Sequence, residues 1–250
     1  MENVIIVPCY NEEKRLPLEG YCNFLEKEES CKIVFVNDGS SDQTLHVLNN
    51  INTKFPAKVE VVDLPKNLGK AQAIQVATIQ CLKDFPDAKK IGYLDADLAT
   101  SLEEWLSISN FIEGDIVFAF GSRISKIDNN IRRKNYRHYL GRGIATAIST
   151  LLRLTVYDTQ CGCKVFRRDI AENLFKESFL SKWLFDVELF FRLKNSFGAE
   201  KMKNICREIP LQKWQDVAES KVQFTYFFRL WYDLFLINKK YNNAAKKIAR

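Results

Sequence analysis

Asp95 and Asp97 are the two residues of this chain whose types and spacing most clearly suit chemistry. They stand two positions apart, directly after the apolar residues 91–94, and a short apolar run that leads into acidic residues predicts a buried strand ending at a solvent-facing edge. Mg²⁺ and Mn²⁺ prefer oxygen ligands and are usually held by one or two carboxylates, while water and substrate phosphates complete their shell. The pair therefore predicts a metal site that neutralises a diphosphate, and a solvated turn is the alternative interpretation.

Three more polar clusters follow predicted strands in the first half of the chain. Strand-like runs that alternate with helical ones predict βαβ units and a mainly parallel sheet. Because ligands bind such sheets at the carboxyl ends of the strands, we expect all four clusters to lie on one rim. The expected strands span residues 4–7, 33–37, 59–63, 91–94 and 116–120, and the clusters span residues 8–12, 38–42, 66–70 and 95–97.

Each of these clusters can hold part of a nucleotide. The Tyr10 ring can stack on a base, the Glu12 carboxylate can bond a ribose hydroxyl, and Asp38 is expected to face the base. Lys66 and Lys70 stand at the entrance of a predicted helix, where their charges and free backbone N–H groups can hold phosphate. The alternative for each cluster is a polar turn or a solvated basic loop. Neither G-x-G-x-x-G nor G-x-x-x-x-G-K-[ST] is present, so a dinucleotide fold and a P-loop are not supported.

Composition places the chain among ordinary globular proteins. Its 250 residues suit one large α/β domain or two small ones, with 46% hydrophobic and 27% charged residues. Seven cysteines at irregular positions do not suggest a disulfide framework, so we expect reduced thiols in a cytosolic compartment. No apolar stretch resembles a signal peptide or approaches the roughly 18 residues of a membrane-spanning helix. The net charge of +6 suits a surface that meets anionic lipids, phosphates or nucleic acid.

The second half of the chain predicts two amphipathic helices. Apolar residues recur at helical spacing within residues 132–154, behind a basic segment, and an aromatic-rich helix is expected within residues 222–241. Basic residues beside an apolar face are typical of helices that lie in a membrane interface, and the alternative is that both apolar faces pack onto the core. We expect one domain over residues 1–235, with a nucleotide-binding half at 1–100 and an acceptor half at 101–221. An amphipathic helix and a basic tail are expected at 222–250.

In their order and spacing, the motifs of this chain resemble family 2 inverting glycosyltransferases with a GT-A fold. The resemblance covers about residues 3–235, and the later motifs are similar to the polyprenyl-phosphate branch, which includes dolichyl-phosphate mannose synthases and β-glucosyltransferases. The segment Asp95-Ala96-Asp97-Leu98-Ala99-Thr100 is closer to the β-glucosyltransferases. The early motifs are Pro8-x-Tyr10-Asn11-Glu12, Asp38-Gly39-Ser40-x-Asp42, Asn67-x-Gly69-Lys70 and Asp95-x-Asp97, and the later ones are Gly121-Ser122-Arg123, Asp158-Thr159-Gln160-Cys161-Gly162, Trp183-x-Phe185-Asp186-Val187-Glu188 and Trp214-x5-Ser220-Lys221.

The resemblance implies both a fold and an activity. The fold is α/β, a GT-A (Rossmann-like) single domain in which helices flank a mainly parallel central sheet, with amphipathic helices toward the C-terminus. The activity is metal-dependent, inverting transfer of a hexose to a polyprenyl (dolichyl-type) phosphate, with UDP-glucose as the favoured donor and Mg²⁺ or Mn²⁺ as the cofactor. The protein is expected to bind peripherally at the cytoplasmic face of a membrane.

The resemblance also assigns roles to individual residues. Asp97, together with Asp95, is expected to hold the metal. A phosphate acceptor has a second pKa of about 6 and is largely a dianion at neutral pH, so the enzyme needs cations for the acceptor more than a general base. The expected donor-binding residues are Pro8, Tyr10, Glu12, Asp38, Lys66, Asn67, Gly69, Lys70, Asp95 and Ala96. The expected acceptor-phosphate residues are Arg123, Arg133, Arg137 and Lys221, and the expected catalytic residues are Asp95, Asp97, Arg123, Gln160 and Asp186.

Other interpretations stay open at this point. The nearest enzymatic alternative uses GDP-mannose or a UDP-N-acetylhexosamine, or transfers the sugar to a saccharide. Another is a catalytically silent nucleotide-sugar-binding protein that recruits membrane partners, which the intact Asp95 and Asp97 disfavour. Nucleic-acid binding is not expected, because the basic groups border an apolar helix and do not alternate with exposed aromatics. A separate membrane protein partner and a homo-oligomer are both left open.

Overall fold

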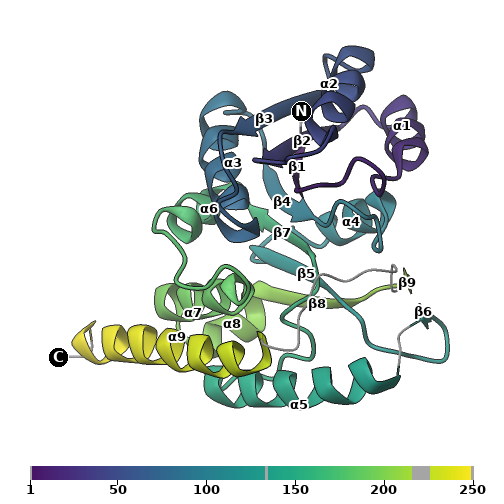
Figure 1. Ribbon diagram of the computed structural model, residues 1–250. Coiled ribbons are helices and arrows are strands. Elements are labelled where there is room, and N and C mark those ends of the chain that lie inside the picture. The colour runs from purple at the N-terminus through teal and green to yellow at the C-terminus, as the bar shows by residue number, and fades with distance from the viewer. Residues whose placement is uncertain (1, 133–134, 216–225, 249–250) are drawn as a thin grey trace.

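The computed structural model describes residues 2–132, 135–215 and 226–248, with side chains described except at 132–140, 226–228 and 243–248. Within these residues, helices cover both faces of a seven-stranded sheet, and a two-stranded sheet pairs β6 with β9 (Figure 1). The strands are β1 (Asn3–Cys9), β2 (Cys31–Asp38), β3 (Val59–Leu64), β4 (Lys90–Leu94), β5 (Phe118–Ser122), β6 (Asn130–Arg132), β7 (Cys163–Arg167), β8 (Cys206–Pro210) and β9 (Lys213–Gln215). The helices are α1 (Leu18–Lys27), α2 (Thr44–Lys54), α3 (Lys70–Asp84), α4 (Leu102–Ser109), α5 (Asn135–Leu152), α6 (Arg168–Phe175), α7 (Phe185–Phe197), α8 (Ala199–Ile205) and α9 (Tyr226–Ile248).

The large sheet is mainly parallel, which confirms the expectation from the sequence. Its strand order is β3-β2-β1-β4-β7-β5-β8. β1 pairs in parallel with β2 and β4, β2 with β3, and β5 with β8, whereas β7 runs antiparallel to both β4 and β5. All five predicted strands are confirmed, although β5 begins at Phe118 and not at residue 116.

The sequence does not predict β7, because this strand carries a buried charge. Lys164 is its second residue and is 0% exposed. A lysine at such a position breaks the apolar pattern by which a buried strand is recognised. Because β7 lies between β4 and β5, it brings the two halves of the chain into one sheet.

The sheet separates the core into two layers. Alternate residues of β1 point to opposite faces, so that Val4 and Ile6 join one cluster of buried side chains and Ile5 and Val7 join the other. Helices α3, α5, α6, α7, α8 and α9 contribute to the first layer, and α1, α2 and α4 contribute to the second (Figure 1). The central strands are buried on both faces, which explains why they appear in the sequence as continuous apolar runs.

The two amphipathic helices both pack on the first layer. Ile148 and Leu152 of α5 are 0% exposed, so packing onto the core is the correct interpretation for the described apolar face of α5. Helix α9 buries Leu234 and Ile237 in the same cluster, but it leaves Phe235 60% exposed. Helix α9 is therefore part of the core and also presents an apolar side chain outward. In the described part of the chain, no helix is long and apolar enough to cross a membrane.

The packing of α9 can be tested by two substitutions two residues apart. Ile237→Ala should lower the free energy of unfolding by about 2–4 kcal/mol, because it leaves a cavity in the core. Phe235→Ala on the outward face should change it by no more than about 0.5 kcal/mol. Urea unfolding followed by circular dichroism measures both, and equal effects would contradict the packing of α9 described here.

Candidate active site

The loops that follow β1, β2 and β3 are joined at the carboxyl edge of the sheet. Asn11 adopts a φ of 52°, and its side-chain oxygen accepts a hydrogen bond from the Ser41 backbone N–H at 2.8 Å. The Ser40 hydroxyl oxygen accepts one from the Asn11 N–H at 3.0 Å. Gly39 is required at the junction, because a Cβ there would lie 2.3 Å from the carbonyl carbon of Lys66. Three of the four predicted clusters are thus in direct contact.

Asp38 fixes the loop that follows β3. Its two carboxylate oxygens accept hydrogen bonds from the backbone N–H groups of Leu68, at 2.7 Å, and Gly69, at 2.9 Å. The residue is only 3% exposed, and burial raises the pKa of its carboxyl while the two N–H groups oppose that rise. The structure therefore gives Asp38 a positioning role, and its contact with a base stays a prediction.

Asp95 and Asp97 share a tight turn after β4. Leu98 adopts a φ of 48°, which is uncommon for a residue other than glycine, and its N–H bonds to the Asp95 carbonyl oxygen at 3.3 Å. One Asp97 carboxylate oxygen accepts from the Ala99 N–H at 3.0 Å. Burial and then the charge of Asp95 raise the pKa of Asp97, so the two carboxylates are close enough to interact.

Lys70, the first residue of α3, brings a positive charge to this pair. Its Nζ donates a hydrogen bond to Oδ1 of Asp95. Burial alone would lower the pKa of Lys70, but the nearby carboxylates, first Asp95 and then Asp186, outweigh it and raise that pKa. The N-terminus of a helix carries a partial positive charge and free N–H groups. A cation and a helix N-terminus therefore lie beside the two carboxylates, an arrangement suited to phosphate.

Gly162 makes room for Asp95 just before β7 begins. Its carbonyl oxygen accepts a hydrogen bond from the Asp95 N–H at 3.1 Å. A Cβ at residue 162 would lie 1.9 Å from Oδ2 of Asp95, so any side chain there would displace the carboxylate. The placement of Asp95 thus depends on Gly162, which lies 67 positions later in the chain.

Asp186 belongs to a buried charged network under the rim. It is 4% exposed, and one of its carboxylate oxygens lies 2.6 Å from Nζ of Lys164 and accepts a hydrogen bond from the Tyr93 hydroxyl. Lys164 also donates to the Cys161 carbonyl oxygen at 2.6 Å. These partners connect β4, β7 and the start of α7. The predicted contact of Asp186 with a sugar hydroxyl stays a prediction.

Arg123 is held in two-point contact by Asp158. Its Nε and Nη2 donate to the two carboxylate oxygens at 2.6 and 2.8 Å, a strong charge-assisted geometry. Burial opposes both charges, but Asp158 raises the pKa of Arg123, and Arg123 lowers the pKa of Asp158 to about 2. The two-donor edge predicted for an acceptor phosphate is thus engaged within the protein. A phosphate role for Arg123 stays a prediction that must use its remaining nitrogen.

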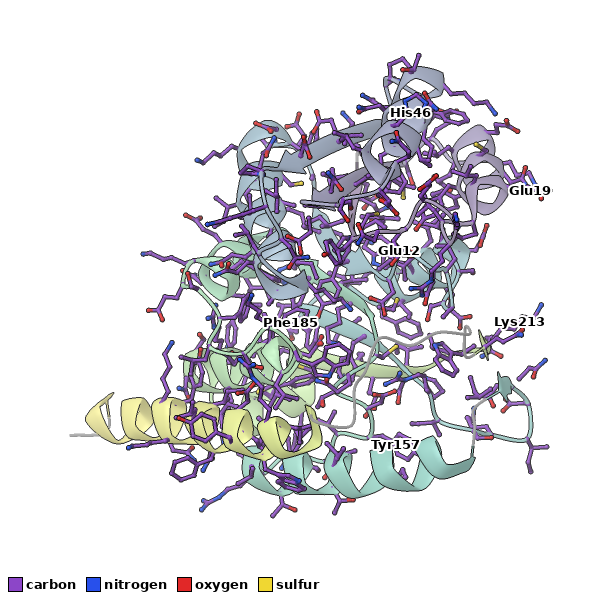
Figure 2. The ribbon with its side chains drawn as sticks, viewed as in Figure 1. Glu12, Glu19, His46, Tyr157, Phe185 and Lys213 are labelled. Carbon is purple, nitrogen blue, oxygen red and sulfur yellow. The ribbon has the colours of Figure 1, made fainter. Side chains whose placement is uncertain are left out.

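The segment around Asp158 is held from two further sides. Glu208 of β8 accepts the Asp158 backbone N–H at 2.7 Å. The guanidinium of Arg142 in α5 lies 3.7 Å from the centre of the Tyr157 ring, so this segment rests against α5 (Figure 2). The backbone N–H of Gln160 bonds to an Asp158 oxygen at 3.2 Å. The Asp158 carboxylate therefore holds both Arg123 and the backbone of Gln160 in place.

Gln160 presents an amide donor that a ligand could use. Its side-chain Nε2 is buried and has no hydrogen-bond partner among the described residues. Leaving such a donor unsatisfied costs about 1–3 kcal/mol. A substrate oxygen that reached Nε2 would remove this cost, which supports the predicted contact with substrate.

Comparison with known proteins identifies the family of this chain. The profile of glycosyl transferase family 2 matches residues 4–175. The chain belongs to this family. It is 31% identical to a dolichyl-phosphate beta-glucosyltransferase of Homo sapiens, over 98% of this chain and 77% of that protein. It is 30% identical to the corresponding enzyme of Mus musculus, again over 98% and 77%.

A solved structure shares the fold of this glycosyltransferase. Glucosyl-3-phosphoglycerate synthase from Mycobacterium tuberculosis, in complex with Mn²⁺, uridine diphosphate and glucosyl-3-phosphoglycerate, superposes with a TM-score of 0.69. The match covers 95% of this chain and 80% of that one at 13% identity. The expected GT-A type of α/β fold is confirmed.

The other predicted site residues of the glycosyltransferase fall into three groups. Ala96 is buried, and its carbonyl oxygen accepts a hydrogen bond from the Tyr21 hydroxyl at 3.0 Å, so its backbone helps to hold the turn that carries Asp95 and Asp97. The residues exposed on the rim are Tyr10, Lys66 and Asn67, and those half-buried are Pro8, Glu12 and Gly69. The side chains of Arg133, Arg137 and Lys221 lie outside the described part of the chain, so their predicted contact with the acceptor phosphate stays a prediction.

The residues at the rim fit a divalent metal that binds together with a diphosphate. Among the described residues there is no group of three or more His, Cys, Asp or Glu that could enclose a metal ion. A closed protein cage is not needed, however, because Mg²⁺ is commonly held by one or two carboxylates, with phosphate and water as its other ligands. Asp95 and Asp97 supply such a pair.

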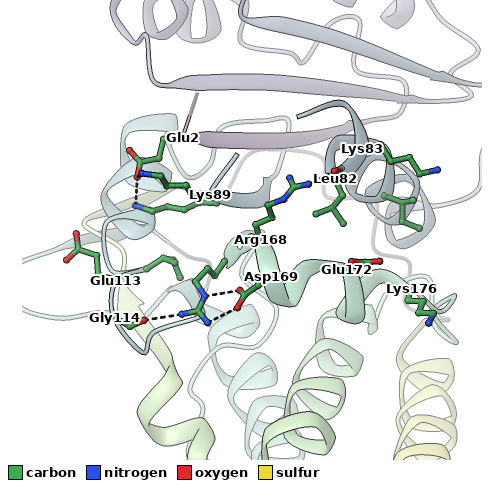
Figure 3. A pocket seen from close by; sticks show the side chains of 14 residues that line it. Glu2, Leu82, Lys83, Lys89, Glu113, Gly114, Arg168, Asp169, Glu172 and Lys176 are labelled. Carbon is green, nitrogen blue, oxygen red and sulfur yellow. Dashed lines mark hydrogen bonds and ion pairs between the residues drawn. The ribbon is translucent and has the colours of Figure 1, made fainter. Parts of the chain in front are cut away.

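A cavity of about 870 Å³ lies at the opposite edge of the sheet (Figure 3). It is lined by charged side chains, including Lys90, the first residue of β4, and Arg167, the last residue of β7. Arg167 makes a two-point contact with Asp169 at 2.8 and 2.7 Å, and Lys90 lies 3.9 Å from Glu2. Arg167 and Lys90 are thus paired within the protein, and we assign no ligand to this cavity.

The pair of Arg123 and Asp158 predicts a pH-dependent stability. Asp158→Asn should lower the free energy of unfolding at neutral pH by about 3–5 kcal/mol, because it leaves a buried guanidinium unpaired. Since the folded pKa of Asp158 is lowered to about 2, the wild-type contribution is complete above the unfolded pKa of about 3.9 and is lost as pH falls toward 2.

Urea unfolding at a series of pH values measures this effect. Asp158→Asn should show less loss of stability on acidification than the wild type. Asp169→Asn, which breaks an exposed pair with Arg167, is the matched control and should cost at most about 1 kcal/mol. If both variants lost the same free energy of unfolding, burial would not strengthen the pair of Arg123 and Asp158.

Proposed function

We propose that this glycosyltransferase transfers glucose from UDP-glucose to a dolichyl-type polyprenyl phosphate, with inversion and with Mg²⁺ or Mn²⁺ as cofactor. The observation that carries the proposal is the arrangement of Asp95, Asp97 and Lys70 at the N-terminus of α3. Two carboxylates suited to a metal lie beside a lysine and free helix N–H groups. A nucleoside diphosphate is the ligand class that uses all of these groups together.

The named relatives support the choice of donor and acceptor. The similar human and mouse proteins are named dolichyl-phosphate beta-glucosyltransferases. The structural neighbour from Mycobacterium tuberculosis was solved with uridine diphosphate and Mn²⁺. The names of the relatives favour glucose over mannose as the transferred sugar, and the neighbour's ligands favour a uridine diphosphate donor and a divalent metal.

The chemistry follows from where charge develops. As the bond between the sugar and the diphosphate breaks, negative charge accumulates on the leaving group. A divalent ion bound by Asp97 and Asp95 would stabilise that charge as a Lewis acid. Lys70, which donates a hydrogen bond to Asp95, would add a second positive charge beside the diphosphate. Such electrostatic stabilisation is commonly the largest contribution to catalysis, and losing one donor costs about 10²–10³ in rate.

The acceptor makes a general base unnecessary. A lipid monophosphate with a second pKa of about 6 already carries the nucleophilic oxygen in ionised form near neutral pH. What it requires is a cationic setting that orients the oxygen toward the sugar. We assign this role to Arg133, Arg137 and Lys221, with support from Arg123, and we assign to Gln160 a hydrogen bond to a substrate oxygen.

The activity can be measured directly. The protein is incubated with Mn²⁺, a short polyprenyl phosphate and a panel of radiolabelled nucleotide sugars, and the lipid phase is extracted. UDP-glucose should label the lipid. Asp97→Asn should reduce labelling by at least about 10², and EDTA should abolish it reversibly. Asp87→Asn, at an exposed position, is the control and should label normally.

Three kinds of outcome would contradict the proposal. Undiminished transfer in excess EDTA would remove the metal from the mechanism. Labelling from a different nucleotide sugar, or label only in a water-soluble saccharide, would favour one of the enzymatic alternatives. No labelling from any donor, despite bound nucleotide sugar, would favour the catalytically silent binding protein.

We also propose that the protein reaches its lipid substrate by peripheral contact of α9 with the membrane surface. The outward face of α9 exposes 62% of Tyr232 and 60% of Phe235, and Lys239 follows one turn after Phe235. Aromatic side chains with a basic neighbour are typical of helices in the bilayer interface. A lysine near an anionic surface contributes about 1 kcal/mol. A separate membrane protein partner and a homo-oligomer stay predictions.

Liposome flotation tests this contact. The protein should float with vesicles, more strongly when they contain anionic lipid and less at high salt. Phe235→Ser should weaken flotation, whereas Phe111→Ser, at a position 45% exposed in the loop after α4, should not. If the wild type stays at the bottom of the gradient with anionic vesicles at low salt, α9 does not bind lipid and a partner must deliver the acceptor.

A further inference from the structure

Lys182 lies over the donor loop although it comes from a distant part of the chain. It belongs to the segment that precedes α7, and its side chain is exposed. Its aliphatic stem crosses Gly69, the residue before α3, because a Cβ built at Gly69 would lie 3.1 Å from Cδ and 3.4 Å from Cγ of Lys182. Lys182 and Lys70 therefore both stand at the N-terminus of α3.

The ammonium of Lys182 has no partner within the described structure. No hydrogen bond or ion pair joins it to another described residue, although its charge is close enough to lower the pKa of Asp38 against the effect of burial. Asp38 makes no direct ion pair with Lys182, and its two oxygens instead accept the backbone N–H groups of Leu68 and Gly69. Two lysines and a helix N-terminus thus gather at one place, and Asp95 neutralises only one of the lysines.

Buried contacts hold the segment that carries Lys182. One oxygen of Glu188, which is 0% exposed, accepts the backbone N–H groups of Leu180 at 2.8 Å and Ser181 at 2.9 Å. The Ser181 hydroxyl donates to Asp233 of α9 at 2.6 Å and accepts the Leu184 N–H at 2.9 Å. A solvated surface lysine needs no such anchoring. Here the residue next to Ser181 is fixed on two sides and faces the donor loop.

We propose that Lys182 is a further donor-binding residue that contacts the diphosphate of the nucleotide sugar at the N-terminus of α3. The proposal rests on the proposed function, since it requires a nucleoside diphosphate at the α3 N-terminus. Asp233 and Glu188 act as positioning residues, because they hold the segment without touching the donor. The diphosphate of UDP-glucose carries two negative charges, which one divalent ion would offset, and the departing UDP gains a third as the bond to the sugar breaks. Lys182 would offset that additional charge.

Titration calorimetry with UDP, UMP and uridine in the presence of Mn²⁺ tests the proposal. Lys182→Met should weaken UDP binding about 10- to 100-fold, as expected for loss of a charge-assisted hydrogen bond, and leave uridine binding unchanged. Lys182→Arg should retain most of the affinity. Lys176→Met, which removes an exposed lysine six residues earlier, is the matched control and should bind UDP like the wild type.

A double-mutant cycle tests the anchoring. Asp233→Asn should weaken UDP binding less than Lys182→Met, and it should add little when Lys182 is already replaced, because both act through the same contact. In steady-state assays Lys182→Met should raise KM for UDP-glucose and leave KM for the acceptor unchanged. Unchanged unfolding midpoints would show that these effects are local.

Several results would overturn the proposal. Wild-type UDP affinity in Lys182→Met would remove the contact. Equal weakening of UDP and uridine would show that Lys182 acts only by packing on Gly69, and a change confined to acceptor KM would move it to the acceptor site. If the wild type binds no UDP or other nucleoside diphosphate, the proposed function itself fails, and this outcome is distinct from the others.

Discussion

The buried ion pair between Lys164 and Asp186 is the interaction on which the arrangement of the site depends. Its atoms lie 2.6 Å apart, with Lys164 fully buried and Asp186 nearly so. Two charges in such a setting are costly unless each is neutralised and hydrogen-bonded, and Tyr93 and the Cys161 carbonyl supply the additional bonds. The pair joins β7 to α7 and, through Tyr93, to β4. It fixes the relative position of the Asp95–Asp97 turn, which follows β4, and of the segment before α7.

Around this pair, the fold holds positive and negative side chains next to one another before any substrate binds. Burial and then repulsion from Asp95 raise the pKa of Asp97, and Lys70 of α3 offsets part of that repulsion. A preorganised set of charges needs little rearrangement when new charge appears, and this is the main source of electrostatic catalysis. The fold achieves the preorganisation with backbone groups as much as with side chains, as the contacts of Asp38 with Leu68 and Gly69 illustrate.

The sequence predicts the parts of this structure that are determined locally. The first five strands are visible because each is a short apolar run, and the rim residues are visible because polar clusters follow those runs. Strand β7 cannot be recognised from the sequence, because Lys164 interrupts its apolar pattern. The groups that compensate this buried charge, the Asp186 carboxylate and the Cys161 carbonyl oxygen, are identified only by the structure. Amphipathic periodicity likewise shows that α5 and α9 have apolar faces without showing what covers them.

The functional residues that sequence reasoning missed are those that act across long separations. Gly162 matters because its missing side chain leaves space for Asp95, and nothing in the local sequence identifies that neighbour. Lys182 resembles any exposed lysine until its stem is found over Gly69. The Arg123 guanidinium was assigned to a phosphate by its chemistry, but in the structure Asp158 already occupies its two-donor edge.

Helix α9 has a consequence for any shortened form of this protein. Because α9 exposes aromatic side chains, a protein that ends before Tyr226 would be an obvious choice for improving solubility. Such a truncation would also delete Ile237 from the core and the Asp233 carboxylate that holds Ser181. Ending the chain there would therefore expose part of the core. Replacing Tyr232 and Phe235 with polar residues is the better way to improve solubility, because it leaves the buried face of the helix intact.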